Sequence, residues 1–83
     1  NEVDIYPNPS GGIFNITFSH PELVSGYQIE IYNVLGEKVY SQLSTFNSQL
    51  SINLSNQPNG IYLYRILNVT SKLIGEGKLI IQK

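Results

Sequence analysis

The feature that most constrains the fold of this chain is an alternation of apolar and polar residues with a period of two. In residues 14–18, Phe and Ile alternate with Asn and Thr, and the same pattern recurs in residues 27–31 and 50–54. Successive side chains of a strand point to opposite faces, so this pattern is typical of strands with one buried face. Segments rich in Pro, Gly and Asn separate the runs, and no segment shows the period of a helix.

Seven strands are predicted from these patterns, at residues 3–6, 14–18, 27–31, 37–42, 50–54, 61–69 and 77–82. Many short strands between turns favour an all-β fold, and we predict a small antiparallel β-sandwich of the immunoglobulin-like type. A small barrel is the main alternative. The length of 83 residues allows one domain, spanning residues 1–83. The side chains predicted to face the core are Phe14, Ile16, Ile29, Ile31, Leu50, Ile52 and Leu54.

Two reversals of the chain are predicted from turn residues. The first joins the first two strands, because a residue before proline is pushed to extended geometry and Gly11 and Gly12 tolerate positive φ. The second is a β-turn in residues 33–36, closed by Gly36 at positive φ. We interpret the residues that define these turns as structural: Tyr6, Pro7, Asn8, Pro9, Gly12, Asn33 and Gly36.

A tyrosine corner is a further prediction, at the start of the longest strand. Pro58 fits the second position of a turn, Gly60 fits the αL position that closes it, and Tyr62 stands two residues into the strand. In immunoglobulin-like folds, a tyrosine at this place bonds the backbone a few residues upstream through its hydroxyl. The alternative is a plain turn followed by a surface tyrosine.

The ionisable residues argue against catalysis and against binding of metal or nucleic acid. Lys and Arg number 5 and Asp and Glu number 6, so the net charge of −1 offers no basic face for phosphates. With no Cys and one His, the chain lacks the cluster of ligands that a metal site needs, and we expect no metal and no cofactor. No apolar run approaches the ~18 residues of a membrane span. The titratable side chains show no spacing that indicates a catalytic pair: Glu2, Asp4, His20, Glu22, Glu30, Glu37 and Glu76.

The C-terminal segment, Lys78–Lys83, departs from the alternation. Its three consecutive apolar residues, Leu79, Ile80 and Ile81, cannot all face one core, and a lysine stands at each end of the segment as a guard against edge aggregation. If this strand lies at a sheet edge, a partner protein can add a strand to it, with the terminal carboxylate as a second point of attachment. The alternative is a strand buried on both faces.

Four segments, taken in order, resemble a known family. They are Tyr6–Phe14 (YPNPSGGIF), Ile31–Val39 (IYNVLGEKV), Pro58–Tyr62 (PNGIY) and Gly77–Lys83 (GKLIIQK). Their order and spacing resemble the C-terminal sorting domain, type A, of the type IX (Por) secretion system of Bacteroidetes. The resemblance covers essentially the whole chain.

This resemblance implies a non-catalytic secretion signal at the C-terminus of a larger exported protein. Such domains address an N-terminal cargo domain from the periplasm to an outer-membrane translocon, and a sortase-like surface peptidase then commonly removes the domain and anchors the cargo. The expected locations are the periplasm in transit and then the cell surface or medium. The alternative function is a β-sandwich spacer or carbohydrate-binding module appended to a secreted enzyme. In the family the signal is concentrated at the extreme C-terminus, which here consists of Lys78, Leu79, Ile80, Ile81, Gln82 and Lys83.

Overall fold

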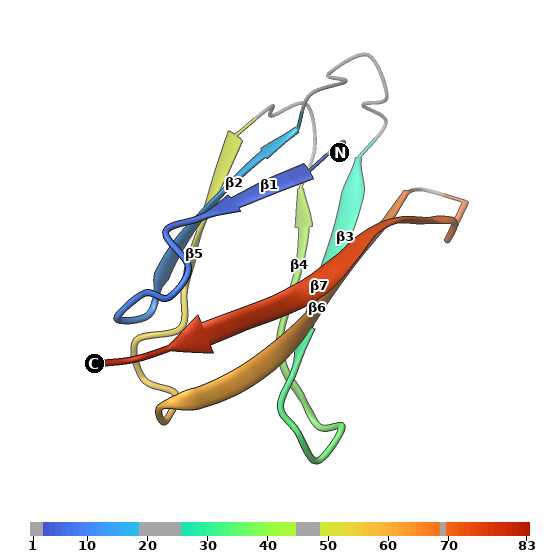
Figure 1. Cartoon of the computed structure of the whole chain (residues 1–83). Coiled ribbons are helices and arrows are strands. Elements are labelled where there is room, and N and C mark those ends of the chain that lie inside the picture. The colour runs from blue at the N-terminus through green and yellow to red at the C-terminus, as the bar shows by residue number, and fades with distance from the viewer. Residues whose placement is uncertain (1–2, 19–25, 45–48, 69) are drawn as a thin grey trace.

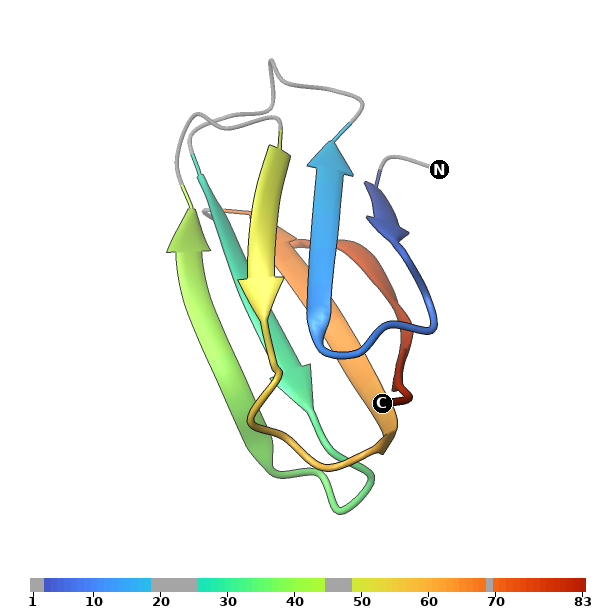
Figure 2. The same cartoon turned by 90° about the vertical axis from the view of Figure 1, so that its left-hand side faces the viewer.

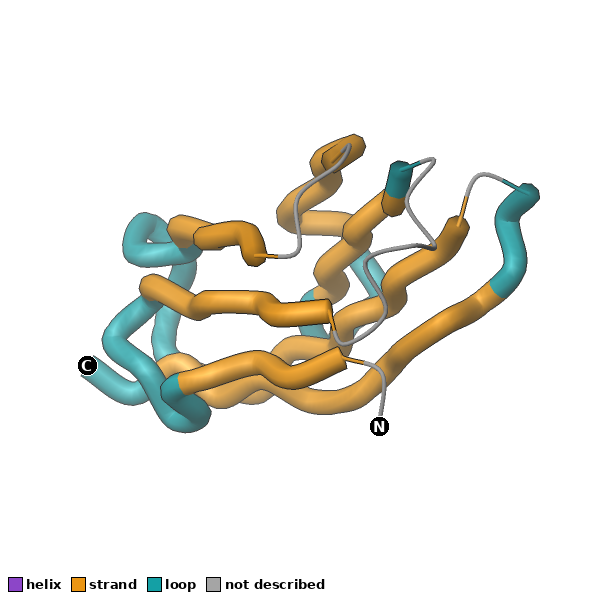
Figure 3. Tube along the Cα trace, turned by 90° about the horizontal axis from the view of Figure 1, so that it is seen from above, coloured by secondary structure: helices purple, strands orange, loops and turns teal. Residues whose placement is uncertain are grey.

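The computed structural model describes residues 3–18, 26–44, 49–68 and 70–83, and these residues form seven strands (Figure 1). Strands and connecting turns account for all of the described residues, with no helix among them (Figure 3). The predicted all-β class is confirmed. The strands are β1 (Val3–Tyr6), β2 (Ile13–Phe18), β3 (Tyr27–Tyr32), β4 (Lys38–Ser44), β5 (Gln49–Asn53), β6 (Gly60–Asn68) and β7 (Leu73–Ile81).

The strands form two sheets that pack face to face. One sheet has the strand order β1-β2-β5, and the other has the order β4-β3-β6-β7. Neighbouring strands are antiparallel in every pair. Figures 2 and 3 show the two layers, with β1 and β7 at neighbouring edges of the sandwich. Two separate sheets exclude a closed barrel, so the sandwich prediction is confirmed.

The core lies between the sheets and is built from the apolar members of each alternation. Six of the seven side chains predicted to face inward are 0–1% exposed, and the seventh, Leu50, is only partly buried on the edge strand β5. The rings of Phe18 and Tyr27 stack at 4.1 Å between centroids, which joins the two sheets at one end. The buried hydrophobic residues are Val3, Phe14, Ile16, Phe18, Tyr27, Ile29, Ile31, Ile52, Leu54, Tyr62, Ile66, Leu79 and Ile81.

The last strand begins earlier than the sequence predicts. It starts at Leu73 rather than at Gly77 and is as long as β6, with which it pairs along its length. Two glycines, Gly75 and Gly77, lie in this part of the strand, and each lies where another side chain packs closely. A Cβ at Gly75 would meet Val3 Cγ2 at 3.2 Å, and one at Gly77 would meet the Tyr64 ring at 2.8 Å. The glycines therefore give room for close packing inside a continuous strand.

The turn between β3 and β4 has the geometry that the sequence predicts. The Gly36 N–H donates to the Asn33 carbonyl at 3.0 Å, and Gly36 adopts a φ of 84°. The Asn33 side chain holds the turn from inside, because its Oδ1 accepts hydrogen bonds from the N–H groups of Leu35 and Glu37, both at 3.0 Å. Asparagine in this role acts as a substitute for a backbone turn.

Candidate functional site

The C-terminal strand divides its side chains between core and surface. Leu79 and Ile81 are 0% and 1% exposed, whereas Ile80 is 37% exposed and Lys78 lies at the surface. As expected, the three apolar side chains do not all face one core, because Ile80 lies at an outward position. The backbone alternation of inward and outward positions continues to Ile81. The alternative of a strand buried on both faces is excluded.

β7 is an edge strand, as expected for strand addition. The outer backbone groups of its C-terminal half, however, are already hydrogen-bonded within the chain. The segment Asn8–Ser10, which we call the edge cap, lies along it. The Asn8 side chain donates to the Lys78 carbonyl at 2.8 Å and accepts from the Ile80 N–H at 2.9 Å. The Ser10 N–H donates to the Ile80 carbonyl at 3.0 Å, and the Ser10 carbonyl accepts from the Gln82 N–H at 2.8 Å. The folded chain thus does not offer this stretch for strand addition.

Lys83 is an exposed residue that hydrogen bonds hold in place. Its Nζ donates to the carbonyls of Ser55 and Gln57 at 2.7 and 2.8 Å, and its N–H donates to Asn59 Oδ1 at 3.1 Å. Lys78 is exposed and forms no ion pair within the described residues. The two lysines therefore differ, since one fastens the end of the chain to the loop between β5 and β6.

The residues around the edge cap form a tight connection between β1 and β2. The Tyr6–Pro7 and Asn8–Pro9 peptide bonds are both cis, and Tyr6 is 44% exposed. Gly12 adopts a φ of 136°, and a Cβ there would meet the Ser55 Cα at 2.6 Å. Gly11 has no positive φ and has open space around it, so only one of the two predicted glycines is required.

The predicted tyrosine corner is confirmed. The Tyr62 hydroxyl donates to the Pro58 carbonyl at 2.7 Å, and the Tyr62 side chain is 4% exposed. Tyr62 pairs with Leu79 across β6 and β7, so the corner supports the C-terminal end of β7. One detail differs from the prediction. Gly60 has a φ of 152°, which is positive but far from the αL value.

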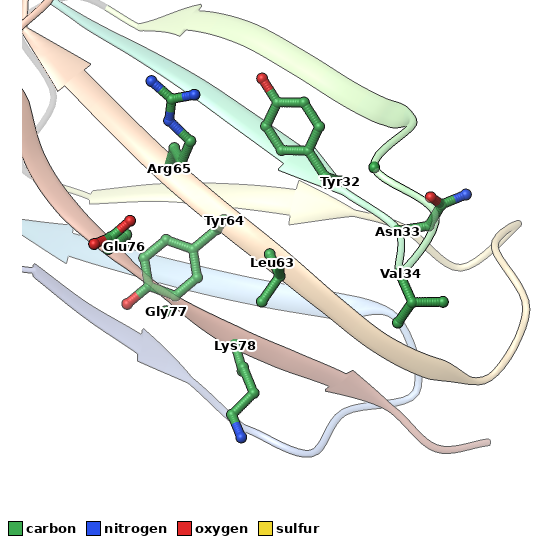
Figure 4. Close-up of a pocket in the computed structure, with 10 residues that line it drawn as sticks. Tyr32, Asn33, Val34, Leu63, Tyr64, Arg65, Glu76, Gly77 and Lys78 are labelled. Atoms are coloured by element: carbon green, nitrogen blue, oxygen red, sulfur yellow. The ribbon is translucent and has the colours of Figure 1, made fainter.

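An apolar patch lies on the outer face of the larger sheet, beside the outward residues of β7. Ile61 and Ile80 form a cross-strand pair and are 47% and 37% exposed, and Leu63, 47% exposed, pairs with Lys78. Next to them is a groove of about 440 Å³ between β3, β6, β7 and the β3–β4 turn (Figure 4). Its lining includes Tyr32, Asn33, Val34, Leu63, Arg65 and Lys78.

The groove is bordered by a small network of ionisable side chains. Tyr32 Oη donates to Glu30 Oε1 at 2.7 Å, and Lys38 Nζ lies 3.4 Å from Glu30 Oε2. The Tyr32 hydrogen bond and then Lys38 hold the pKa of Glu30 below its usual value, while the same hydrogen bond raises the pKa of Tyr32. Burial raises the pKa of Tyr64 on the inner face. These pKa shifts follow from a local network of hydrogen bonds and charge and from burial. They do not identify the three residues as a catalytic acid and base.

Among the described residues, no group of three or more His, Cys, Asp or Glu side chains could hold a metal ion. His20, Glu2 and Glu22 lie outside the described residues. The described part of the chain contains no helix of the length and apolar character that a membrane crossing requires.

Sequence reasoning missed the residues that join the two motif segments. Asn8 and Ser10 were interpreted as parts of a turn, although they reach a strand about 70 residues away. Nothing in the sequence links Ser55, Gln57 and Asn59, which hold Lys83, to the end of the chain, although Asn59 belongs to the segment Pro58–Tyr62. One sequence signal was available for the outer patch, because Ile61, Leu63 and Ile80 occupy positions where the alternation calls for polar residues.

Comparison with known proteins agrees with this picture. A family profile described as a secretion system C-terminal sorting domain matches residues 4–82. The chain is 30% identical over 79 residues to an ulvan lyase of Nonlabens ulvanivorans, and the match covers 95% of this chain and 14% of that enzyme's length. A solved structure from Bacteroides vulgatus, a DUF3244 family protein with an immunoglobulin-like β-sandwich, superposes with a TM-score of 0.73 at 18% identity. The superposition covers 99% of this chain and 83% of the Bacteroides vulgatus chain.

The superposition confirms the immunoglobulin-like type of the sandwich, and the family match extends over nearly every residue from β1 to the end of β7. Both motif segments that meet at the edge cap lie inside that match. The chain therefore belongs to the family of secretion system C-terminal sorting domains, and its role is that of a type IX secretion signal.

Proposed function

We propose that the sorting signal of this domain consists of the outward side chains at the C-terminal end of β7, namely Lys78 and Ile80, together with Gln82 and Lys83. The domain presents them to an outer-membrane translocon and to sortase-like components of the type IX system. The cargo is a protein joined to the N-terminal side of the domain, which crosses the periplasm and is then released or anchored at the surface. The domain performs this task without catalysing a reaction.

The observation that carries this proposal is the exposed Ile80 and its neighbours. Leu79 and Ile81 are buried in the core and the backbone edge is occupied, so only the outward side chains are free to contact a receptor. Ile80 lies beside Ile61 on a face where the alternation calls for polar residues. An exposed apolar cluster of this kind is typical of protein interaction sites.

The test uses all 83 residues joined to the C-terminus of a periplasmic reporter in a host with type IX secretion. With the native domain, the reporter is expected at the surface or in the medium. Ile80→Ser and Lys78→Ala are expected to lower export several-fold while the melting temperature stays near that of the native domain. Leu43→Ser is the matched control, because Leu43 is 64% exposed on β4 and away from the signal.

Two outcomes would contradict the proposal at different levels. If Ile80→Ser and Leu43→Ser export equally well, these side chains are not the signal. If the reporter with the native domain stays in the periplasm, the domain does not direct export of that cargo. Its function would then be that of a spacer or of a carbohydrate-binding module. Enrichment of the reporter on a polysaccharide column would then separate these two alternatives.

A further inference from the structure

The turn between β3 and β4 carries the two most exposed large apolar side chains of the described residues. Val34 is 72% exposed and Leu35 is 80% exposed. The central positions of such a turn face water and usually hold polar residues. Neither side chain packs against the core. A position that breaks the local pattern without a gain in packing is typical of a functional contact.

The same turn is held in one shape by hydrogen bonds. In addition to the bonds from Leu35, Gly36 and Glu37 to Asn33, the Asn33 N–H donates to the Glu37 carbonyl at 2.9 Å. The Asn33 side-chain amide also donates to Glu37 Oε1 at 2.8 Å. A turn fixed in this way loses little conformational freedom on binding, which favours contact with a partner.

Val34 also lines the groove on the outer face of the larger sheet. Leu63, which is 47% exposed, lies in the same groove and pairs in register with Tyr32 on one side and with Lys78 on the other. Figure 4 shows Leu63 among these three side chains. Apolar groups thus occupy the middle of the groove, and the groove is continuous with the outward side chains of β7.

The charges of the groove lining are not balanced. The lining contains two cations, Arg65 and Lys78, and one carboxylate, Glu76, whereas the whole chain has a net charge of −1. Arg65 and Lys78 are exposed, and their side chains form no hydrogen bond or ion pair within the described residues. The nearby Glu30 is already bound by Tyr32 and Lys38. The charge that complements the groove is therefore a carboxylate, which a guanidinium group can bind through two parallel hydrogen bonds.

We propose that the groove and the β3–β4 turn bind a segment of a partner protein that carries an apolar side chain next to a carboxylate. The apolar side chain packs against Leu63 and Val34, and the carboxylate meets Arg65 and Lys78. An apolar floor favours a peptide over a sugar, because sugar hydroxyl groups would lose water there without a hydrogen bond in return. The inference rests on the proposed function, since Lys78 belongs to both, and it adds the chemistry of the partner and a contact at the turn.

The binding test uses the 83-residue chain and three blocked tripeptides, Leu-Leu-Glu, Leu-Leu-Gln and Ser-Ser-Glu, followed by NMR. Leu-Leu-Glu is expected to give saturable shifts at the backbone amides of Val34, Leu63 and Arg65. Loss of the carboxylate in Leu-Leu-Gln is expected to weaken binding about two- to fivefold, and added salt is expected to weaken Leu-Leu-Glu toward the same level. Ser-Ser-Glu is expected to bind more weakly than either. A galacturonate oligomer serves as the acidic sugar probe.

Two results of this test overturn the inference. One is the absence of saturable shifts with Leu-Leu-Glu, or equal binding of the three peptides. The other is saturable binding of the galacturonate oligomer alone, which would make the groove a sugar site. Neither result depends on export, because both are measured on purified protein.

The export assay tests the same surface with residues outside the proposed signal. Val34→Ser and Arg65→Gln are expected to lower export of the reporter several-fold at an unchanged melting temperature. Lys72→Gln is the matched control for the lost cation, because Lys72 is exposed and lies outside the groove. If Ile80→Ser lowers export but both groove variants export like Lys72→Gln, this inference is overturned and the proposed signal stands. If the native domain leaves the reporter in the periplasm, the proposed function itself fails.

Discussion

The two halves of β7 lie on one sheet edge but are held in different ways. In the first half, Leu73–Gly77, the side chains are small or partly exposed and the outer backbone edge is uncovered among the described residues. In the second half, from Lys78, two side chains are buried in the core and the edge is capped. The family motif Gly77–Lys83 thus lies almost entirely in the half that contributes two fully buried side chains to the core. A substitution there can impair export either by removing a side chain that a receptor contacts or by destabilising the fold, and these two causes must be separated.

The outer faces of the two halves differ as well. In the first half, Glu76 pairs in register with Arg65 of β6, which pairs with Glu30 of β3. In the second half, Ile80 pairs with Ile61. Charged side chains stay hydrated on an open face, whereas a pair of exposed isoleucines loses unfavourable contact with water when a partner covers it. The first half also exposes an apolar pair, because Leu73, 42% exposed, pairs with Leu67. What distinguishes the second half is that its exposed pair lies beside the exposed Leu63.

The largest expected effect comes from the core position of the motif. Leu79→Ala is expected to lower the free energy of unfolding by about 2–5 kcal/mol, because it opens a cavity at a side chain that is 0% exposed. Leu73→Ala is the matched change in the first half and is expected to cost less than about 1 kcal/mol, because Leu73 is 42% exposed. Urea denaturation of both variants measures the difference. Equal costs would show that the second half does not dominate the stability of β7.

The next largest effect distinguishes two tyrosines on the inner face of β6. Tyr62 pairs with Leu79 and Tyr64 pairs with Gly77, so each faces one half of β7. Tyr62→Phe is expected to cost ~1 kcal/mol, because the Pro58 carbonyl loses its hydrogen bond. Tyr64→Phe is expected to change stability by less than ~0.5 kcal/mol, because its hydroxyl forms no hydrogen bond within the described residues. Thermal unfolding followed by circular dichroism gives both values, and a larger loss for Tyr64→Phe would contradict the role of the corner.

The corner also shows what could be predicted from the sequence. A proline, a glycine and a tyrosine within five residues define it, and the period of two defines the faces of the strands, so local patterns were sufficient for both. The cap on β7 could not be found in this way. Nothing local to Asn8 indicates that its amide bonds a strand 70 residues later, because that contact exists only once both sheets have formed.

The remaining errors have the same origin. The start of β7 at Leu73 differs from the predicted start at Gly77, because a glycine inside a strand carries no alternation signal and the side chains that pack over it are not known from the sequence. The hydrogen bonds of the exposed Lys83 could not be predicted, because its partners are carbonyl groups of a distant loop and every loop has carbonyl groups. Leu50 is only partly buried because it lies on an edge strand, and strand order does not follow from periodicity.

A smaller effect separates the two lysines of the motif. Lys83→Ala is expected to lower the free energy of unfolding by about 0.5–1 kcal/mol, because two hydrogen bonds from an exposed ammonium group to carbonyl groups are lost. Lys78→Ala is expected to change it by less than ~0.5 kcal/mol. Chemical denaturation measures the free energy of unfolding of both variants, and the export assay is run on the same variants. Impaired export in Lys78→Ala at unchanged stability would assign that loss to recognition, whereas identical stability of the two variants would refute the anchoring role of Lys83.

The smallest expected effect probes the charged outer row that continues into the first half of β7. The hydrogen bond from Tyr32 and then Lys38 hold the pKa of Glu30 below its usual value of 4.5. A lowered folded-state pKa contributes stability that is present above the unfolded value and is lost as pH falls through the folded value. Wild type is therefore expected to exceed Glu30→Gln by up to ~0.5 kcal/mol near neutral pH, with a difference that shrinks below about pH 4.5. In a Tyr32→Phe background the pH dependence is expected to weaken, because the largest cause of the shift is gone. Denaturation curves across this pH range decide the matter, since a difference that grows on acidification would contradict the assigned role of the Tyr32–Glu30 hydrogen bond.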